Sequence, residues 1–248
     1  MGPMTTPSSE SQLPADASRP TQLELLAEAN QRLVLTVDGL DDATYAQPSM
    51  LPHWTVGHVL AHLALSGEGL AGALGGVATG VGTPMYESQQ ARDRGIAELG
   101  VASPEEIRGR VQASTTLFDR EVSGLPEDLW ETRIEGTPGG PNFPARSTVL
   151  MRLREVEIHH ADLGLEYAND LWVPEFSAQL IEYAGQHDWS TPFRVLARDL
   201  AETWDIGEGE PACTVSGESY DLAWWLTGRD DRGKLTVDRD ELPQVPAW

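Results

Sequence analysis

The segment Arg154-Glu-Val-Glu-Ile-His-His-Ala-Asp162 decides how the fold of this chain is interpreted. Glu155 and His159 are four residues apart, so on a helix they lie on the same face, one turn from each other. This spacing suits two ligands of one metal ion. The segment falls in a helix that we predict from Arg146 to Leu163, closed by Gly164 as its C-terminal cap.

A second pair of possible ligands, His58 and His62, has the same spacing of four residues. It belongs to a predicted helix that starts after Trp54, with Thr55 as its N-cap. In a helix bundle, ligands on facing helices converge in the core, so the two pairs predict a metal site. The residues alone leave open a solvated surface pair on one helix and packed core histidines on the other, and they do not choose between His58 and His62.

The predicted helices define an N-terminal helix bundle over residues 20–166. A capping box at Thr21-Gln-Leu-Glu24 predicts the start of the first helix, and Ser103-Pro-Glu-Glu106 predicts the start of a later one. The helix after Thr55 is expected to end in the glycine-rich stretch Gly67–Gly82. A short helix is expected over Ser88–Leu99, and Pro126–Pro144 is expected to be an irregular connector.

The pattern changes after the bundle, and residues 168–248 predict a small α+β domain. Its expected helices are Pro174–His187 and Tyr220–Gly228. Its expected strands are 193–197, 212–216 and 234–237. Residues 1–19 are rich in Ser, Pro, Thr and Ala and are expected to form a disordered leader.

The charge balance limits the possible partners. The chain has 39 acidic and 17 basic residues among 248, a net charge of −22. Such a charge repels phosphate backbones and anionic lipid surfaces, so we expect neither a nucleic-acid partner nor a membrane partner. No segment is typical of a membrane span or a signal peptide, which predicts a cytoplasmic protein. An enzyme acting on small carboxylates would need arginines at its site.

Cysteine chemistry is a weak explanation for function. Cys213 is the only cysteine, so no disulfide forms within the chain, and a buried thiol is a commoner role than a nucleophile. The sequence also lacks His-Glu-x-x-His and paired cysteines, the motifs of common zinc proteases and zinc fingers.

Four motifs resemble the mycothiol-dependent maleylpyruvate isomerase family, which belongs to the DinB-like four-helix metalloproteins. In chain order they are Leu51-Pro-His-Trp-Thr-Val-Gly-His-Val-Leu-Ala-His62-Leu, Thr83-Pro-Met-Tyr-Glu-Ser-Gln-Gln-Ala-Arg92, Arg154-Glu-Val-Glu-Ile-His159-His-Ala-Asp-Leu-Gly164 and Leu222-Ala-Trp-Trp-Leu-Thr-Gly-Arg229. The Pro-rich end from Leu242 to Trp248 also fits. The resemblance extends over nearly the whole chain after residue 20. It implies a DinB-like bundle followed by a sterol-carrier-like α+β domain.

The resemblance implies roles for individual residues. It matches the family's metal ligands to His62, Glu155 and His159, and so favours His62 over His58. Arg229 matches an arginine that the family is thought to direct at the active site, in the cleft between the domains. As clamps for substrate carboxylates we expect Arg229 first and Arg92 second, although a solvated helix arginine stays an equal alternative for Arg92.

Three more predictions concern neighbours of the ligands. His160 points about 100° away from His159 and is expected to pack rather than to bind metal. Asp162 is expected either to accept a hydrogen bond from a ligand histidine or to be a surface aspartate at a helix end. Trp54, Tyr86, Trp224 and Trp225 are expected to pack between helices or domains.

Two histidines and one carboxylate leave a coordination position open, which is typical of a catalytic metal, and Zn²⁺ is the natural occupant. A thiol bound there loses its proton near neutral pH. The resemblance implies that this thiol is mycothiol, and that the reaction is cis–trans isomerisation of maleylpyruvate to fumarylpyruvate through reversible thiolate addition.

Two alternatives remain at this level. The same metal-activated thiolate would serve a mycothiol S-transferase acting on another electrophile. A non-enzymatic small-ligand binding protein would keep the fold without the chemistry, although three ionisable ligands argue against it. The sequence gives no information on the oligomeric state, and another divalent metal in place of zinc stays open.

Overall fold

The computed structural model describes residues 19–230, 233–239 and 241–245. The chain divides into two compact units, Arg19–Leu171 and Trp172–Trp248, and each is described by itself. The predicted leader lies almost entirely outside the described residues. None of the described helices combines the length and the apolar character that crossing a membrane requires.

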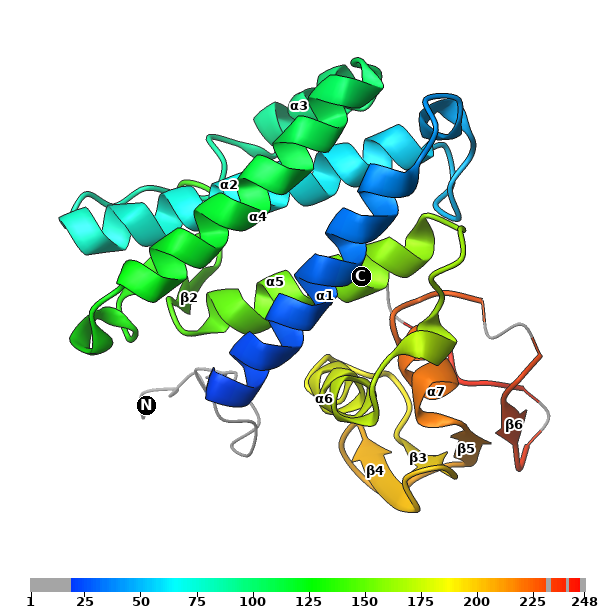
Figure 1. Cartoon of the computed structure of the whole chain (residues 1–248). Helices are drawn as coiled ribbons and strands as arrows, with labels where there is room; N and C mark the ends of the chain where they lie inside the picture. The colour runs from blue at the N-terminus through cyan, green and yellow to red at the C-terminus, as the bar shows by residue number, and fades with distance from the viewer. Residues whose placement is uncertain (1–18, 231–232, 240, 246–248) are drawn as a thin grey trace, which may run out of the picture. The chain divides into compact units, whose positions relative to one another are not determined.

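The first unit is a bundle of helices, as predicted. Its long helices are α1 (Arg19–Gly39), α2 (Val56–Thr79), α4 (Pro104–Gly124) and α5 (Ser147–Asp162), and the short α3 (Gln89–Leu99) follows α2. Helix α2 packs against α4 and α5, while α1 packs against α5 (Figure 1). Apolar residues at helical spacing, such as Leu33 and Val37 of α1, fill the core.

Two of the predicted helix starts are confirmed by their caps. The side chain of Thr55 accepts a hydrogen bond from the backbone N–H of His58, and that of Ser103 accepts one from Glu106 ahead of α4. The prediction for α1 is wrong, because this helix begins at Arg19 and Thr21 lies inside it. Pro20 stands in the first turn, where the missing N–H of proline leaves no helical hydrogen bond unmade.

The expected break in α2 is also wrong, because the helix runs through its glycines to Thr79 and ends where Gly80 takes φ +71°. The glycines allow other segments to approach. A Cβ atom on Gly69 would lie 2.8 Å from the carbonyl oxygen of Met85, and one on Gly76 would lie 2.6 Å from that of Val81. Close packing therefore explains residues that looked like a helix terminator.

The predicted connector contains a small hairpin that the sequence did not reveal. Strands β1 (Arg133–Glu135) and β2 (Asn142–Pro144) pair antiparallel, with Ile134 opposite Phe143. The loop after α2 joins this hairpin, because the backbone N–H groups of Met85 and Tyr86 donate to the carbonyls of Glu135 and Gly136, each at 3.1 Å. The hairpin thereby fixes the segment that leads into α3.

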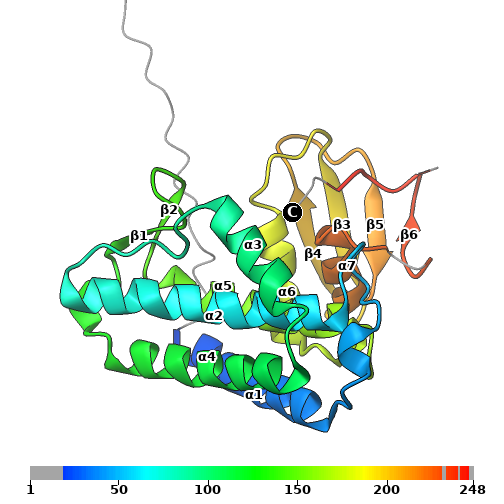
Figure 2. The ribbon, with the colours of Figure 1, turned by 90° about the horizontal axis from the view of Figure 1, so that it is seen from above.

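The second unit is α+β, as predicted. Helices α6 (Pro174–Ala184) and α7 (Ser219–Leu226) accompany strands β3 (Phe193–Ala197), β4 (Glu202–Ile206), β5 (Thr214–Gly217) and β6 (Thr236–Val237). The strands lie side by side in the order β4-β3-β5-β6 (Figure 2), with β3 and β5 parallel and the other two pairs antiparallel. Strand β4 was not predicted, because most of its side chains face solvent and no apolar alternation marks it.

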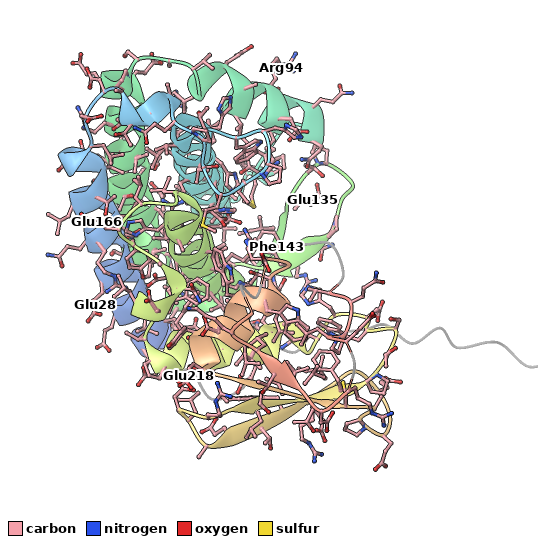
Figure 3. All side chains as sticks on the ribbon, turned by 90° about the vertical axis from the view of Figure 1, so that its right-hand side faces the viewer. Glu28, Arg94, Glu135, Phe143, Glu166 and Glu218 are labelled. Atoms are coloured by element: carbon pink, nitrogen blue, oxygen red, sulfur yellow. The ribbon has the colours of Figure 1, made fainter. Side chains whose placement is uncertain are left out.

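Tryptophans pack in this second unit. Trp224 and Trp172 lie with their rings 5.8 Å apart, and Trp225 meets the ring of Phe193 at 5.6 Å. In the first unit, the labelled acidic residues Glu28, Glu135 and Glu166 are exposed (Figure 3). The surface therefore carries the negative charge that the composition indicates.

Candidate metal centre

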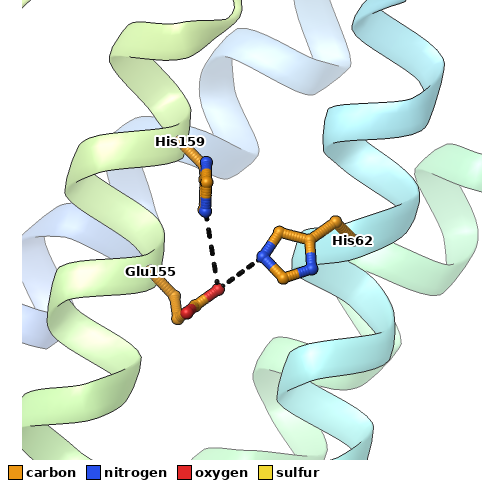
Figure 4. A group of neighbouring side chains, drawn as sticks. All are labelled: His62, Glu155 and His159. Carbon is orange, nitrogen blue, oxygen red and sulfur yellow. Dashed lines mark ion pairs between the residues drawn. The ribbon is translucent and has the colours of Figure 1, made fainter. Parts of the chain in front are cut away.

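Three predicted ligands come together inside the first unit. His62 extends from α2, and Glu155 and His159 extend from the same face of α5 (Figure 4). Glu155 Oε2 lies 2.6 Å from His62 Nε2 and 3.8 Å from His159 Nε2. The possible ligand atoms of the three residues all lie within 4.8 Å of one another, and the two imidazole rings stand at 88°.

The donor atoms fit a divalent metal ion. Glu155 Oε2 is buried and makes no hydrogen bond of acceptable geometry, although His62 Nε2 is close to it. A buried carboxylate oxygen without such a bond is costly unless a cation satisfies it. Two imidazole nitrogens and one carboxylate oxygen form the ligand set of catalytic zinc sites, which leave a further position open.

The protonation states also suit metal binding. Burial alone would raise the pKa of Glu155, but His62, His159 and Arg152 outweigh burial and hold that pKa well below its usual range. Burial lowers the pKa of His62. An ionised carboxylate and a neutral imidazole are the forms in which these groups bind metals.

The second nitrogen of each histidine also has a neighbour. His159 Nδ1 lies 2.8 Å from Oδ2 of the buried Asp162, so this carboxylate orients the ring with Nε2 toward Glu155. His62 Nδ1 lies 3.4 Å from Nη2 of Arg92. Asp162 is therefore a partner of a cluster histidine and not a surface aspartate at the helix end.

The other two histidines near the cluster have different positions. His58 Nδ1 lies 2.7 Å from Thr55 Oγ1 as part of the cap of α2. His160 Nε2 lies 2.9 Å from Thr36 Oγ1 of α1, and its ring stacks on Tyr167. Burial, followed by the charge of Arg32, lowers the pKa of His160 to about 3. Neither residue belongs to the group of possible ligands found among the described residues.

Arg92 lies beside the cluster, and Arg229 belongs to the other unit. Besides its contact with His62, Arg92 pairs with Asp93 at 2.9 Å and has its guanidinium carbon 6.0 Å from the ring centre of Tyr86. Arg229 donates to the backbone carbonyl of Thr227 at 2.7 Å and lies over the ring of Trp224. The predicted approach of Arg229 to the metal stays a prediction.

Two further neighbours of the cluster are Trp54, which was expected only to pack, and Arg152, for which the sequence predicted no role. The ring of Trp54 meets that of His62 edge-on at 5.8 Å. Arg152, one turn before Glu155, is fully buried and donates from Nη1 to the carbonyl oxygen of Leu63 at 2.6 Å. The only signal for Arg152 was its position between apolar residues on the predicted helix, and arginine is rarely buried.

Comparisons with known proteins identify the family of this chain. Residues 26–164, more than half of the chain, match the model of the mycothiol maleylpyruvate isomerase N-terminal domain. Two solved structures resemble this chain with a TM-score of 0.83 at 25% identity, covering 94% of this chain and 98% of theirs. They are crystal structures of the mycothiol-dependent maleylpyruvate isomerase and of a mutant with one histidine changed to alanine.

No curated protein matches the chain. The family model nevertheless extends from residue 26, inside α1, to residue 164, just after the end of α5. This segment contains His62, Glu155 and His159. The predicted family resemblance is confirmed: this chain belongs to the mycothiol maleylpyruvate isomerase family.

Proposed function

We propose that this chain is an enzyme that isomerises maleylpyruvate to fumarylpyruvate with mycothiol as its thiol cofactor and a divalent metal, most simply Zn²⁺, at the cluster. The observation that carries the proposal is the convergence of His62, Glu155 and His159 in the matched family domain. The likeness to crystal structures of the mycothiol-dependent maleylpyruvate isomerase, over 94% of the chain, supports the same reaction.

The cluster residues would hold the metal through His62 Nε2, His159 Nε2 and a carboxylate oxygen of Glu155. When bound, the metal and mycothiol supply a thiolate whose reversible addition to the cis double bond permits rotation, with no net redox change. Asp162 holds the ring of His159 with its Nε2 on the side of Glu155, where that nitrogen would be available to a metal ion. Glu155 contributes a negative charge that neutralises part of the charge of the cation.

Arginines would hold the substrate carboxylates against a chain of net charge −22. Arg92 supports this role by its position, since its guanidinium lies 3.4 Å from His62 and its side chain is a quarter exposed. For Arg229 the support is its match to the family's C-terminal motif. Trp54 covers one side of His62 and would limit the access of water.

The ionised Glu155 weighs against the alternative of a small-ligand carrier. A carrier gains nothing from a carboxylate that is ionised and lacks a hydrogen bond of good geometry. The S-transferase alternative uses the same metal and thiol, and therefore has to be separated from isomerisation by assay.

The test mixes the purified, zinc-loaded protein with maleylpyruvate and follows the formation of fumarylpyruvate with and without mycothiol. We expect conversion only with mycothiol, and its loss in His159→Ala together with bound zinc. His160→Ala, the adjacent histidine on the other side of α5, is the matched control and should retain zinc and activity. A fully zinc-loaded protein that leaves maleylpyruvate unconverted in the presence of mycothiol would overturn the isomerase in favour of S-transfer to another electrophile.

A further inference from the structure

Arg152 is a charged residue inside the core of the bundle. It is 0% exposed and the largest fully buried side chain among the described residues. It stands one turn before Glu155 on α5, and its Nη1 bonds to the carbonyl of Leu63, the residue that follows His62 on α2. The guanidinium therefore lies between the two helices that carry the predicted ligands.

Helix α2 has a matching gap for this guanidinium. A Cβ atom on Gly67 would lie 3.1 Å from Cζ and Nη2 of Arg152 and 3.2 Å from Nη1. Any larger residue at position 67 would press on the planar group. A glycine inside a helix costs about 1 kcal/mol relative to alanine, so this space has a cost in stability.

The hydrogen bonds of Arg152 do not account for its burial. Nε and Nη2 are buried and have no hydrogen-bond partner, so the guanidinium makes one strong bond and leaves two donor atoms unsatisfied. A leucine or methionine would fill the same core at lower cost. Burial lowers the pKa of Arg152 to about 10, opposed by Glu155, Asp119 and Tyr86, so the side chain stays charged at neutral pH.

The positive charge of Arg152 changes the net charge around the cluster of His62, Glu155 and His159. Glu155 contributes −1, so a divalent ion bound there with two neutral histidines leaves the centre at about +1. Arg152 adds a second positive charge about one helical turn from Glu155 on α5. A cation in this position would weaken metal binding by repulsion and would strengthen the binding of an anion to the bound metal.

We propose that Arg152 is a fixed positive charge that makes the metal centre selective for anionic ligands, at a cost in metal affinity. The ligands of this class are thiolates and carboxylates, which the net charge of −22 otherwise repels. The inference rests on the metal site of the proposed function but not on the isomerase reaction. Arg152 acts on these ligands through its charge. Its substitution should therefore lower the affinity for anionic ligands without lowering the affinity for neutral ligands, whereas substitution of a purely structural residue would change both affinities together.

The test uses the full-length protein loaded with Co²⁺, whose visible spectrum reports on ligands in the open position. Azide is the anionic probe and imidazole the neutral one. In Arg152→Gln, which keeps a donor for the Leu63 carbonyl but no charge, we expect azide affinity to fall about tenfold. Imidazole affinity should stay within about twofold, and Co²⁺ affinity, measured by competition with a chelator, should be unchanged or higher.

Two further variants control this result. Arg152→Lys keeps the charge and should retain most of the azide affinity. Arg110→Met removes a positive charge from α4, where Arg110 pairs with Glu68 at 2.6 Å, and should change neither probe. If Arg152→Gln does not fold, Arg152→Met provides the same neutral comparison.

The outcomes separate the inference from the function. Azide affinity unchanged in a folded neutral variant, or azide and imidazole affinities falling together with Co²⁺ affinity, would overturn the role of Arg152 and leave it a packing residue. If the parent protein itself fails to bind Co²⁺, the metal site of the proposed function fails, and the inference fails with it. If the parent binds Co²⁺ but lacks isomerase activity, only the reaction is wrong.

Discussion

One face of α5 presents Glu155 and His159 to α2, and the other presents Glu157 and His160 to α1. Both faces place a carboxylate and an imidazole within one turn of each other, in the same six-residue stretch. On the α1 side the carboxylate has conventional partners. Arg32 donates to Glu157 Oε1 at 2.6 Å, and the hydroxyl of Tyr167 donates to Oε2.

The electrostatics of the two carboxylates differ accordingly. Burial raises the pKa of Glu157, although the bonds from Tyr167 and Arg32 oppose it, whereas His62, His159 and Arg152 together lower the pKa of Glu155. Glu155 is thus held ionised although its Oε2 lacks a good hydrogen bond, whereas both carboxylate oxygens of Glu157 accept hydrogen bonds. The comparison teaches that residue types and spacing do not distinguish a metal site from a structural network, whereas the hydrogen bonding of the two carboxylates does.

The largest expected effect comes from removing the carboxylate charge of Glu155 on the α2 face. Glu155→Gln should lower zinc affinity more than about 100-fold, because changes outside the ligand set already cost about 10–100-fold. Glu157→Gln, the matched change two residues away, should leave zinc affinity within about threefold. Chelator competition measures both, and similar losses in the two variants would erase the distinction between the faces.

A smaller effect is expected for the partner of His159. Asp162→Asn keeps an acceptor for His159 Nδ1 but removes the negative charge that favours the required tautomer. Zinc affinity should fall about 10-fold to 100-fold. Chelator competition against the parent measures this change, and an affinity equal to that of the parent would remove Asp162 from the site.

The network on the α1 side should respond in stability alone. Tyr167→Phe removes the hydroxyl that donates to buried Glu157. The free energy of unfolding should fall by about 1–3 kcal/mol, the cost of leaving a buried polar group without its partner. Urea denaturation of the metal-free protein measures the loss. Zinc affinity should not change, and a parallel loss of zinc would show that the two faces are coupled through α5.

The smallest effect is expected for Thr36→Val. This change keeps the volume of the side chain and removes the hydroxyl 2.9 Å from His160 Nε2. We expect a loss of about 1 kcal/mol in the free energy of unfolding. A thermal melt compared with that of the parent measures it, and no detectable change would mean that stacking on Tyr167 is sufficient to hold His160.

Features that depend on nearby residues were predictable. Thr55 and Ser103 cap their helices because capping needs only the side chain and the backbone three residues later. The spacing of Glu155 and His159 on one helix face was predictable for the same reason. Their convergence with His62 depends on how α2 and α5 pack, so the residues alone did not choose between His58 and His62.

Features that depend on distant segments were not predictable. The glycines of α2 resembled a helix terminator, and only the approach of Met85 and Val81 shows that they serve packing. The hairpin of β1 and β2 is too short, and β4 too exposed, to leave an apolar pattern. Arg152 was missed because the space that accommodates its burial belongs to another helix.

The contact between Gly67 and Arg152 makes substitutions at two positions far apart in the sequence depend on each other. A Cβ atom at position 67 would lie 3.1 Å from the guanidinium, so a substitution there requires the guanidinium to shift or residue 152 to become smaller. The reverse order is open, since a smaller residue at 152 leaves a space that position 67 can later fill. Lineages that lose the buried arginine can therefore lose the glycine as well. Among related sequences, a residue larger than glycine at position 67 should accompany a residue smaller than arginine at position 152.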